Sequence, residues 1–137
     1  MIADLSPSDR SKYACALHAA KLVESGMKVG LGTGSTAYWL VHHLAERVRN
    51  EDLEFVGVPT STRTKNQAYA EGIKIISMDD AGRLDITIDG ADEFDQSMNL
   101  IKGGGGAHLQ EKIVAFGSDI MVVIADESKK VNTLGKF

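Results

Sequence analysis

The chain has 137 residues, of which 43% are hydrophobic and 25% charged, and its formal net charge at pH 7 is −4. This composition is typical of one globular domain and excludes a wholly disordered chain. The sequence has no run of about 18 apolar residues, so we expect no membrane-spanning helix. The acidic balance and the lack of a basic run argue against a nucleic-acid-binding protein.

The cysteine content and the first four residues indicate a cellular compartment. Cys15 is the only cysteine, so an internal disulfide framework and a cysteine-rich zinc site are excluded. Sparse cysteine is typical of proteins in a reducing cytoplasm. Residues 1–4 contain neither a basic patch nor an apolar run, and we therefore expect no signal peptide and a cytoplasmic location.

The first predicted element is a helix that begins at Pro7. Ser6 suits the N-cap and Pro7 the first helical position, and Gly26 is a typical C-terminal stop. The predicted apolar stripe consists of Ala14, Leu17, Ala20, Leu22 and Val23. Cys15 lies on the apolar side of this helix, where we expect it to be a packing residue.

Apolar strands and helical patterns alternate along the rest of the chain. Strands are predicted at residues 27–31, 54–58, 73–76, 84–88 and 120–125, and helices at 39–48, 60–70 and 107–116. The last strand is apolar without alternation, which predicts burial on both faces. Alternating strands and helices indicate βαβ units and a parallel sheet. We expect Trp39, on the second helix, to belong to the core.

A glycine-rich turn, residues 30–36, follows the first predicted strand and enters a helix. Glycines let the backbone approach an anion, and the helix start offers unpaired N–H groups, so phosphate binding is favoured. No lysine follows the last glycine, which excludes a Walker loop. A dinucleotide site also fits in part, but the acidic residues lie at the beginning of the second strand instead of its end. A purely structural turn is the third alternative.

Two further motifs follow the fourth predicted strand. Residues 89–93 place three acids beside Gly90, and such carboxylates can carry protons, bind Mg²⁺ or Ca²⁺, or simply form a polar turn. Lys102 opens a run of four glycines, which predicts either a close approach of backbone to a ligand or a hinge. Glu111 follows on a helix, where it could be a general base or a glutamate favoured near a helix start.

The motifs share a position in the predicted sheet. The glycine-rich turn, residues 60–62 and the acidic motif each follow a strand, and Lys129 lies just past the last strand. Because ligands bind at the carboxyl ends of parallel strands, we expect one shared site there. We expect no metal site among the histidines, because His42 and His43 are adjacent on a helix and His18 and His108 are isolated.

Together these motifs resemble ribose-5-phosphate isomerase of the A type. The matching segments are residues 30–36, 89–93, 102–105, 111–113, 125–129 and 134–137. Their order and spacing agree over essentially the whole chain. The resemblance implies an α/β fold, with a Rossmann-like, open, mostly parallel sheet and helices on both faces. It also implies that residues 1–137 form one catalytic sugar-phosphate isomerase domain.

The resemblance implies roles for particular residues when it is carried over by position. The substrate-binding residues are Thr33, Gly34, Ser35, Thr36, Asp89, Gly90, Ala91, Asp92, Lys102, Gly103, Gly104, Gly105 and Lys129. The catalytic residues are Glu111, Asp89, Asp92 and Lys102. Lys12 is a further candidate for contact with phosphate. His108 stands where the family is usually apolar, so we expect a local packing change there.

The implied activity interconverts ribose 5-phosphate and ribulose 5-phosphate in the non-oxidative pentose phosphate pathway, without a metal or organic cofactor. Glu111 would move a proton between neighbouring carbons through an enediolate, and Lys102 would stabilise the oxyanion. Asp89 or Asp92 would carry the second proton. A non-catalytic sugar-phosphate-binding module or an inactive fragment is the alternative.

The resemblance also bears on length and partners. Family members are longer, with a further α+β segment that would begin near Phe137. This segment is expected to contribute to oligomer contacts and to packing of the sheet. We therefore expect a homo-oligomer, a dimer or tetramer, of the full-length protein, and no nucleic-acid or membrane partner.

Overall fold

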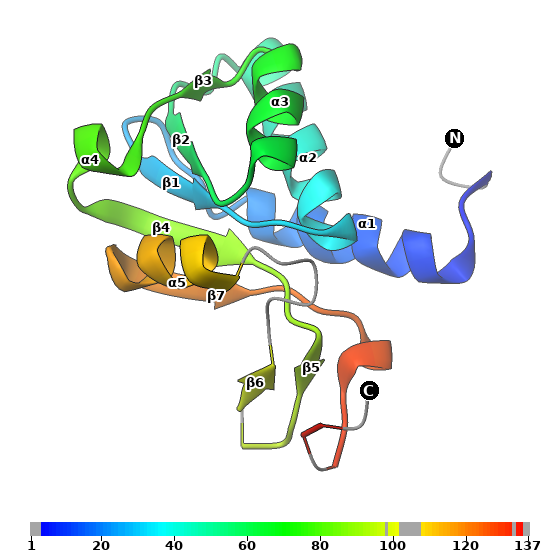
Figure 1. Ribbon diagram of the computed structural model, residues 1–137. Helices are drawn as coiled ribbons and strands as arrows, with labels where there is room; N and C mark the ends of the chain where they lie inside the picture. Colours follow the sequence, from blue (N-terminus) through cyan, green and yellow to red (C-terminus); the bar gives the residue numbers. More distant parts are fainter. Residues whose placement is uncertain (1–3, 98, 102–107, 133, 136–137) are drawn as a thin grey trace.

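The computed structural model describes residues 4–97, 99–101, 108–132 and 134–135 (Figure 1). The helices are α1 (Pro7–Ala20), α2 (Ser35–Glu51), α3 (Thr62–Ala70), α4 (Met78–Ala81) and α5 (His108–Phe116), with a 3₁₀ helix, η2, at Glu127–Lys129. The strands are β1 (Lys28–Leu31), β2 (Val56–Pro59), β3 (Lys74–Ile75), β4 (Leu84–Asp89), β5 (Glu93–Phe94), β6 (Leu100–Ile101) and β7 (Ser118–Val123).

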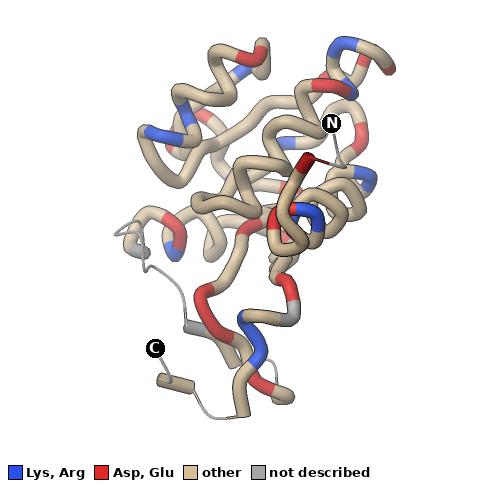
Figure 2. The backbone as a smooth tube through the Cα atoms, turned by 90° about the vertical axis from the view of Figure 1, so that its right-hand side faces the viewer, with Lys and Arg blue, Asp and Glu red and all other residues tan. Residues whose placement is uncertain are grey.

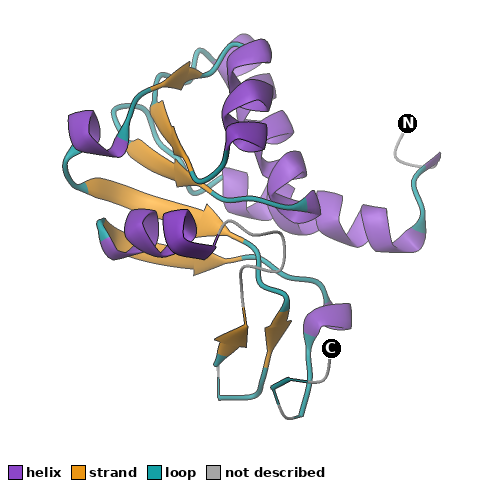
Figure 3. Ribbon diagram, viewed as in Figure 1, coloured by secondary structure: helices purple, strands orange, loops and turns teal. Residues whose placement is uncertain are grey.

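Five strands form one parallel sheet in the order β3-β2-β1-β4-β7. Helices α1, α2 and α3 pack on one face, and α5 with the short α4 packs on the other, as Figure 3 shows. The prediction of an open parallel sheet with helices on both faces is confirmed. β5 and β6 form a separate antiparallel pair beyond the carboxyl end of β4.

Helix α1 begins as predicted, but its buried face differs from the predicted stripe. The Ser6 hydroxyl accepts a hydrogen bond from the Asp9 amide at 3.1 Å and so caps the helix. Leu17, a member of the predicted stripe, is 39% exposed. The buried residues are Ala16, Ala19 and Ala20. Small side chains occupy this face because α1 packs directly against α2.

The end of α1 is also earlier than predicted. The helix ends at Ala20, and Gly26, with a φ of 92°, lies in the turn before β1. Arg47 of α2 caps the C-terminal end of α1, because its Nη1 donates hydrogen bonds to the carbonyl oxygens of Ala20 and Val23, each at 2.7 Å. Ala20 is the last residue of α1 and Val23 lies just beyond it, so neither carbonyl has a partner within the helix.

The larger core cluster lies between the sheet and α1, α2 and α3. Its fully buried side chains include Val23, Val29, Leu31, Leu40, Val41, Leu44 and Ile88. Trp39 and Cys15 pack against this cluster, as predicted. Burial raises the pKa of the Cys15 thiol, which keeps the side chain protonated and suited to packing.

The prediction that the last strand is buried on both faces is wrong. β7 lies at the edge of the sheet, where β4 is its only partner among the described strands, and Ile120 is 58% exposed. The neighbouring α5 also exposes apolar side chains, at Leu109, Ile113 and Phe116. Within the described part of the chain, no helix is both long and apolar enough to cross a membrane.

The remaining predicted elements are confirmed with shifted ends. α3 begins at Thr62 because the Ser61 hydroxyl accepts the Thr64 amide at 3.1 Å. Neither α4 nor the β5–β6 hairpin was predicted. In the hairpin, Asp95 Oδ1 accepts the amide of Asn99 at 2.9 Å. The hydrogen bonds from Asn99 lower the pKa of Asp95, so the ionised carboxylate stabilises the turn.

Candidate functional site

The carboxyl ends of β1 and β4 bring two predicted site residues together. Thr33 follows β1 and Asp89 ends β4, and these strands are neighbours in the sheet. The Thr33 amide donates a hydrogen bond to Asp89 Oδ1 at 3.1 Å, and the Gly90 amide donates to the same oxygen at 2.7 Å. Asp89 is only 1% exposed. Its carboxylate therefore fixes the glycine-rich turn from inside the fold.

Gly32 makes this contact possible. A Cβ atom at this position would lie 2.1 Å from Asp89 Oδ1 and 2.6 Å from Asp89 Cα. The sequence predicted that the glycines allow a close approach to the backbone. At Gly32 the group that approaches the backbone is the carboxylate of Asp89. This glycine therefore allows a contact within the protein, whereas the sequence predicted a contact with a ligand.

Threonine hydroxyls tie the other side of the turn to β2 and α3. The Thr60 hydroxyl donates to the Leu31 carbonyl at 2.9 Å, which leaves the Thr33 hydroxyl to donate to Thr60 Oγ1 at 2.7 Å. The Thr64 hydroxyl donates to the Gly32 carbonyl at 2.8 Å. The sequence singled out residues 60–62 but missed Thr64, for which a cluster of hydroxyl residues after a strand was the available signal.

The start of α2 has the features of an anion site. Gly34 is the N-cap and has a φ of 107°, a conformation that favours glycine. Because Gly34 has no side chain, it cannot cap the first N–H groups of the helix. Ser35 is exposed and Thr36 is 9% exposed beside these groups. The N–H groups and hydroxyls together suit a phosphate ligand.

The acidic motif divides into residues with different environments. Glu93 is 1% exposed, and its Oε1 accepts the Gly135 amide at 2.7 Å, so it connects β5 to the last described residues. Asp92 is half-buried, like Gly90 and Ala91. Asp92 is therefore more accessible than Asp89 and Glu93, the other two carboxylates of the motif.

Glu111 lies in the first turn of α5, which begins beside the carboxyl end of β4 (Figure 1). Its side chain is 6% exposed. A glutamate favoured only for the helix dipole would face solvent, because desolvating a carboxylate is costly. Burial at this edge of the sheet therefore favours the functional interpretation of Glu111.

Of the three lysines that the sequence predicts to bind substrate, the structure describes Lys129 and Lys12. Lys129 ends η2 just past β7 and is half-buried. Its neighbourhood is anchored to the hairpin, because the Val131 amide donates to the Phe94 carbonyl at 2.8 Å. Lys12 is half-buried on α1. Lys102, Gly103, Gly104 and Gly105 lie outside the described residues.

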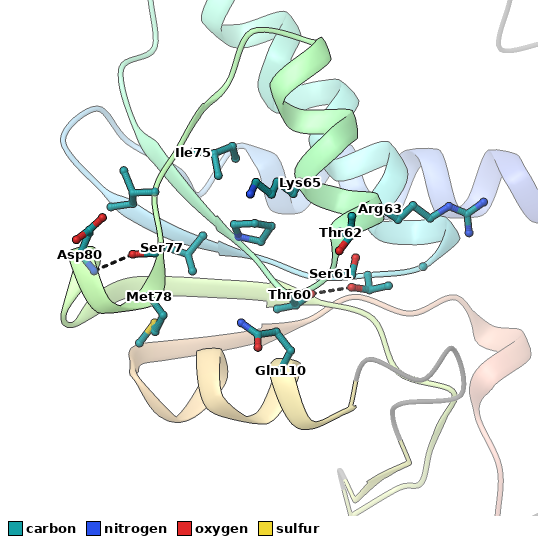
Figure 4. Close-up of a pocket in the computed structure, with 15 residues that line it drawn as sticks. Thr60, Ser61, Thr62, Arg63, Lys65, Ile75, Ser77, Met78, Asp80 and Gln110 are labelled. Atoms are coloured by element: carbon teal, nitrogen blue, oxygen red, sulfur yellow. Dashed lines mark hydrogen bonds between the residues drawn. The ribbon is translucent and has the colours of Figure 1, made fainter.

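One cavity among the described residues has a volume of about 890 Å³. Figure 4 shows it between the segment that joins β2 to α3 and Gln110 of α5. Thr33, Gly34, Arg63 and Lys65 are among the residues that line it. Of the predicted site residues, the cavity thus includes only two from the glycine-rich turn, and it does not include Asp89, Asp92, Glu111 or Lys129.

The distribution of charge agrees with a local anion site. In Figure 2, basic and acidic positions are interspersed over the described backbone. A continuous basic stripe is the usual footprint of a nucleic-acid-binding surface. The backbone N–H groups at the start of α2 can bind an anion without such a stripe.

The two adjacent histidines of α2 have neighbouring rings. The ring centroids of His42 and His43 are 5.5 Å apart, and the ring planes are inclined at 66°. Helical side chains lean toward the N-terminus, which can bring neighbouring rings together. His43 is 1% exposed, and this burial lowers its pKa and keeps the imidazole neutral.

Comparison with known proteins relates the whole chain to one family. The family model of ribose 5-phosphate isomerase A (phosphoriboisomerase A) matches residues 56–137. Ribose-5-phosphate isomerase A of Roseobacter denitrificans is 66% identical over 137 residues, which are 100% of this chain and 52% of that protein. The chain therefore spans about half the length of the curated relatives it matches.

Solved structures agree with this relationship. Ribose 5-phosphate isomerase A of Methanocaldococcus jannaschii is 45% identical, with a TM-score of 0.91 over 94% of this chain and 57% of that one. A D-ribose-5-phosphate isomerase in complex with phospho-erythronic acid is 38% identical, with a TM-score of 0.92 over 96% of this chain and 58% of that one. The chain belongs to the ribose 5-phosphate isomerase A family.

Proposed function

We propose that the protein interconverts ribose 5-phosphate and ribulose 5-phosphate through an enediolate, with Glu111 as the base. Family membership supports this reaction. The observation that carries the site is the hydrogen bond between the Thr33 amide and the Asp89 carboxylate. It joins the glycine-rich turn to the acidic motif, and it supports a single site at the edge where α5 begins.

In this proposal the phosphate of the open-chain sugar binds at the start of α2. The N–H groups of the first turn donate hydrogen bonds to the phosphate oxygens, together with Gly34 and the hydroxyls of Thr33, Ser35 and Thr36. Lys129, and more weakly Lys12, supply positive charge. The phosphate does not react, and its binding energy holds the reacting carbons in position.

The relative in complex with phospho-erythronic acid supports this class of ligand. That compound joins a phosphate to a polyhydroxy acid. Its carboxylate carries negative charge on two oxygens, as an enediolate does on two neighbouring oxygens. We infer that this chain accepts a ligand of the same chemistry.

Glu111 removes the proton from C2 of the aldose and returns it to C1, so one carboxylate serves both steps. The family resemblance assigns Lys102 to stabilising the oxyanion, and Gly103, Gly104 and Gly105 to binding the substrate. The site needs no metal or organic cofactor for these steps.

The second proton moves from the oxygen on C2 to the oxygen on C1. Asp92 is the better candidate for this transfer because it is half-buried, whereas Asp89 is 1% exposed and accepts two amides at Oδ1. We assign Asp89 chiefly to holding the turn and the substrate, with Gly90 and Ala91 lining the site.

We further propose that residues 1–137 form the catalytic domain of a longer, cytoplasmic enzyme that works as a homo-oligomer. The 52% share of the Roseobacter relative supports the longer chain. The sparse cysteine supports the cytoplasmic location. The family resemblance supports the homo-oligomer.

A proton NMR time course of ribose 5-phosphate in D₂O with a chelator tests the reaction. Two proteins are compared: the chain itself, and the chain continued with the remaining sequence of the Roseobacter relative. We expect ribulose 5-phosphate to form with deuterium at the carbon next to the carbonyl. Glu111→Gln should lower turnover by about 10²–10⁴-fold and keep ligand binding.

Glu54→Gln is the matched control, since it removes an exposed carboxylate far along the chain from the site. Turnover that persists unchanged in Glu111→Gln shows that the base is assigned wrongly. If the chain and the extended chain, both without substitutions, bind ribose 5-phosphate but do not convert it, the non-catalytic sugar-phosphate-binding module is supported. A melting temperature raised by NAD(P) and not by ribose 5-phosphate supports the dinucleotide alternative.

A further inference from the structure

A second cluster of potential ligands lies on α2, outside the proposed active site. It consists of His42, His43 and Glu46, and we call it the α2 cluster. One ring nitrogen or carboxylate oxygen from each residue lies within 4.8 Å of the other two. We propose that the α2 cluster binds a divalent transition-metal ion, with Zn²⁺ as the best match.

The hydrogen bonding of His43 leaves one ring nitrogen for a metal. His43 Nε2 lies 3.0 Å from the carbonyl oxygen of Tyr13. A carbonyl only accepts, so Nε2 carries the hydrogen and Nδ1 carries the lone pair. Nδ1 is buried, and no group in the described part of the chain donates a hydrogen bond to it. A buried acceptor of this kind is costly unless something binds it.

Both ring nitrogens of His42 lie near a carboxylate. Its Nε2 lies 2.9 Å from Glu46 Oε1, one helical turn along α2. Its Nδ1 lies 3.8 Å from Glu71 Oε1, at the end of α3. Glu71 can therefore accept the N–H of Nδ1 while Nε2 binds the ion.

His43 thus has an outer acceptor that fixes its tautomer, and His42 has a carboxylate close to its second ring nitrogen. Metal-binding histidines almost always donate their second ring N–H to a carboxylate or a backbone carbonyl. Here the Tyr13 carbonyl takes this role for His43, and Glu71, 3.8 Å from His42 Nδ1, would take it for His42 after a small movement. Burial lowers the pKa of His43, which keeps its imidazole in the neutral form that metals require.

The geometry needs only a small adjustment. Ligands about 2.1 Å from a tetrahedral ion lie about 3.4 Å from one another. The side chains of His42 and Glu46 are 22% and 44% exposed, so they can rotate inward while His43 remains packed. Two histidines and one glutamate leave a fourth position for water, a ligand set that zinc enzymes also use.

The cluster is accessible from solvent. His43 and Glu46 line a cavity of about 420 Å³ at the surface between α1 and α2. Lys21 and Arg47 also line it, and Arg47 is already bound to the carbonyls of Ala20 and Val23 and to Glu51. With neutral imidazoles, Glu46 and Glu71 supply the negative charge that balances the ion.

Titration of tag-free protein with Zn²⁺ near neutral pH, followed by calorimetry, tests the proposal. We expect saturable binding of one ion per chain. His42→Gln and Glu46→Gln should each weaken Zn²⁺ affinity by at least about tenfold. Co²⁺ in place of Zn²⁺ should give a visible absorption band that both variants lose, and circular dichroism checks that they remain folded.

His18→Gln is the matched control, because His18 is an exposed histidine on α1 outside the cluster. It should leave the affinity unchanged. The proposal is overturned if no 1:1 binding occurs, or if the two cluster variants bind as tightly as the parent protein. Zn²⁺ binding that Asp92→Asn abolishes and His42→Gln does not would place the ion at the acidic motif and would equally overturn it.

Discussion

The amide of Thr33 reaches Asp89 Oδ1, 3.1 Å away, through space that is open only because Gly32 has no side chain. The two bonded residues are far apart in the sequence, and the pairing of β1 with β4 brings them together. A carboxylate in this position orders the backbone of a binding turn and also forms part of the acidic motif. The stability of the fold and the geometry of the proposed site therefore depend on the same contact.

Gly32→Ala tests this dependence. The added Cβ would meet the Asp89 carboxylate at 2.1 Å, so we expect the free energy of unfolding to fall by about 1–3 kcal/mol. Affinity for ribose 5-phosphate should fall as well. Urea denaturation and ligand-induced thermal shifts measure the two effects. In the control, Gly90→Ala, the only described atom that the Cβ meets is the Ile124 carbonyl oxygen, at 3.5 Å. An equal loss of stability there would refute the steric argument.

Thr60→Val tests the hydroxyl network. The change keeps the shape of the side chain, but it leaves the Leu31 carbonyl without its hydroxyl donor and the Thr33 hydroxyl without its acceptor. Because Thr60 is 1% exposed, we expect a loss of about 1–3 kcal/mol in urea denaturation. Thr62→Val, at an exposed position, should change the midpoint little. Equal effects of the two changes would contradict a role for the buried hydroxyl.

Arg47→Met tests the cap at the end of α1. The change removes the donor to the carbonyls of Ala20 and Val23, and we expect a loss of about 2 kcal/mol in the free energy of unfolding. Arg49→Met, at an exposed position in the last turn of α2, controls for charge and helix propensity. A midpoint that moves as much for Arg49→Met as for Arg47→Met would show that the carbonyl contacts contribute nothing.

The buried His43 predicts a dependence of stability on pH. Burial lowers its folded-state pKa below 6.5, so between the two pKa values the unfolded state binds more protons than the folded state. The stabilising contribution is complete above about pH 6.5 and decreases as the pH falls toward the folded-state pKa. Urea midpoints from about pH 7.5 to 5, with a chelator present, measure this trend.

Two variants separate His43 from other titrating groups. His43→Phe should flatten the trend below about pH 6.5, whatever its effect on stability at neutral pH. His18→Gln should keep the trend, since His18 is exposed on α1. If His43→Phe retains the full pH dependence, another group is responsible.

Local chemistry explains which elements could be predicted from the sequence. Ser6 and Pro7 define the start of α1 through their own backbone preferences, and the pattern of α2 identifies its core face. The buried face of α1 could not be predicted in this way, because close packing against α2 favours alanine over Leu17. An apolar pattern measures hydrophobicity, whereas burial also depends on a partner, as the exposed Ile120 of β7 shows.

The same distinction applies to the candidate site. The order of motifs predicted that Thr33 and Asp89 would lie at one edge of the sheet, and the structure brings them into contact. The fit of Asp89 against Gly32 and the bond from Thr64 to the Gly32 carbonyl depend on register between strands, which no single segment encodes. Glu93 belongs to the acidic motif by sequence, yet its hydrogen bond gives it a structural role.

The hydrogen bonds of the sheet continue past the ends of its strands. The Gly32 amide donates to the Ile88 carbonyl at 2.9 Å, and the Thr60 amide donates to the Leu31 carbonyl at 3.0 Å. Amide hydrogens in these turns should therefore exchange with solvent as slowly as those of the strands they extend. A ligand arriving at this edge would meet a backbone that folding has already ordered, and its binding would cost little further conformational entropy.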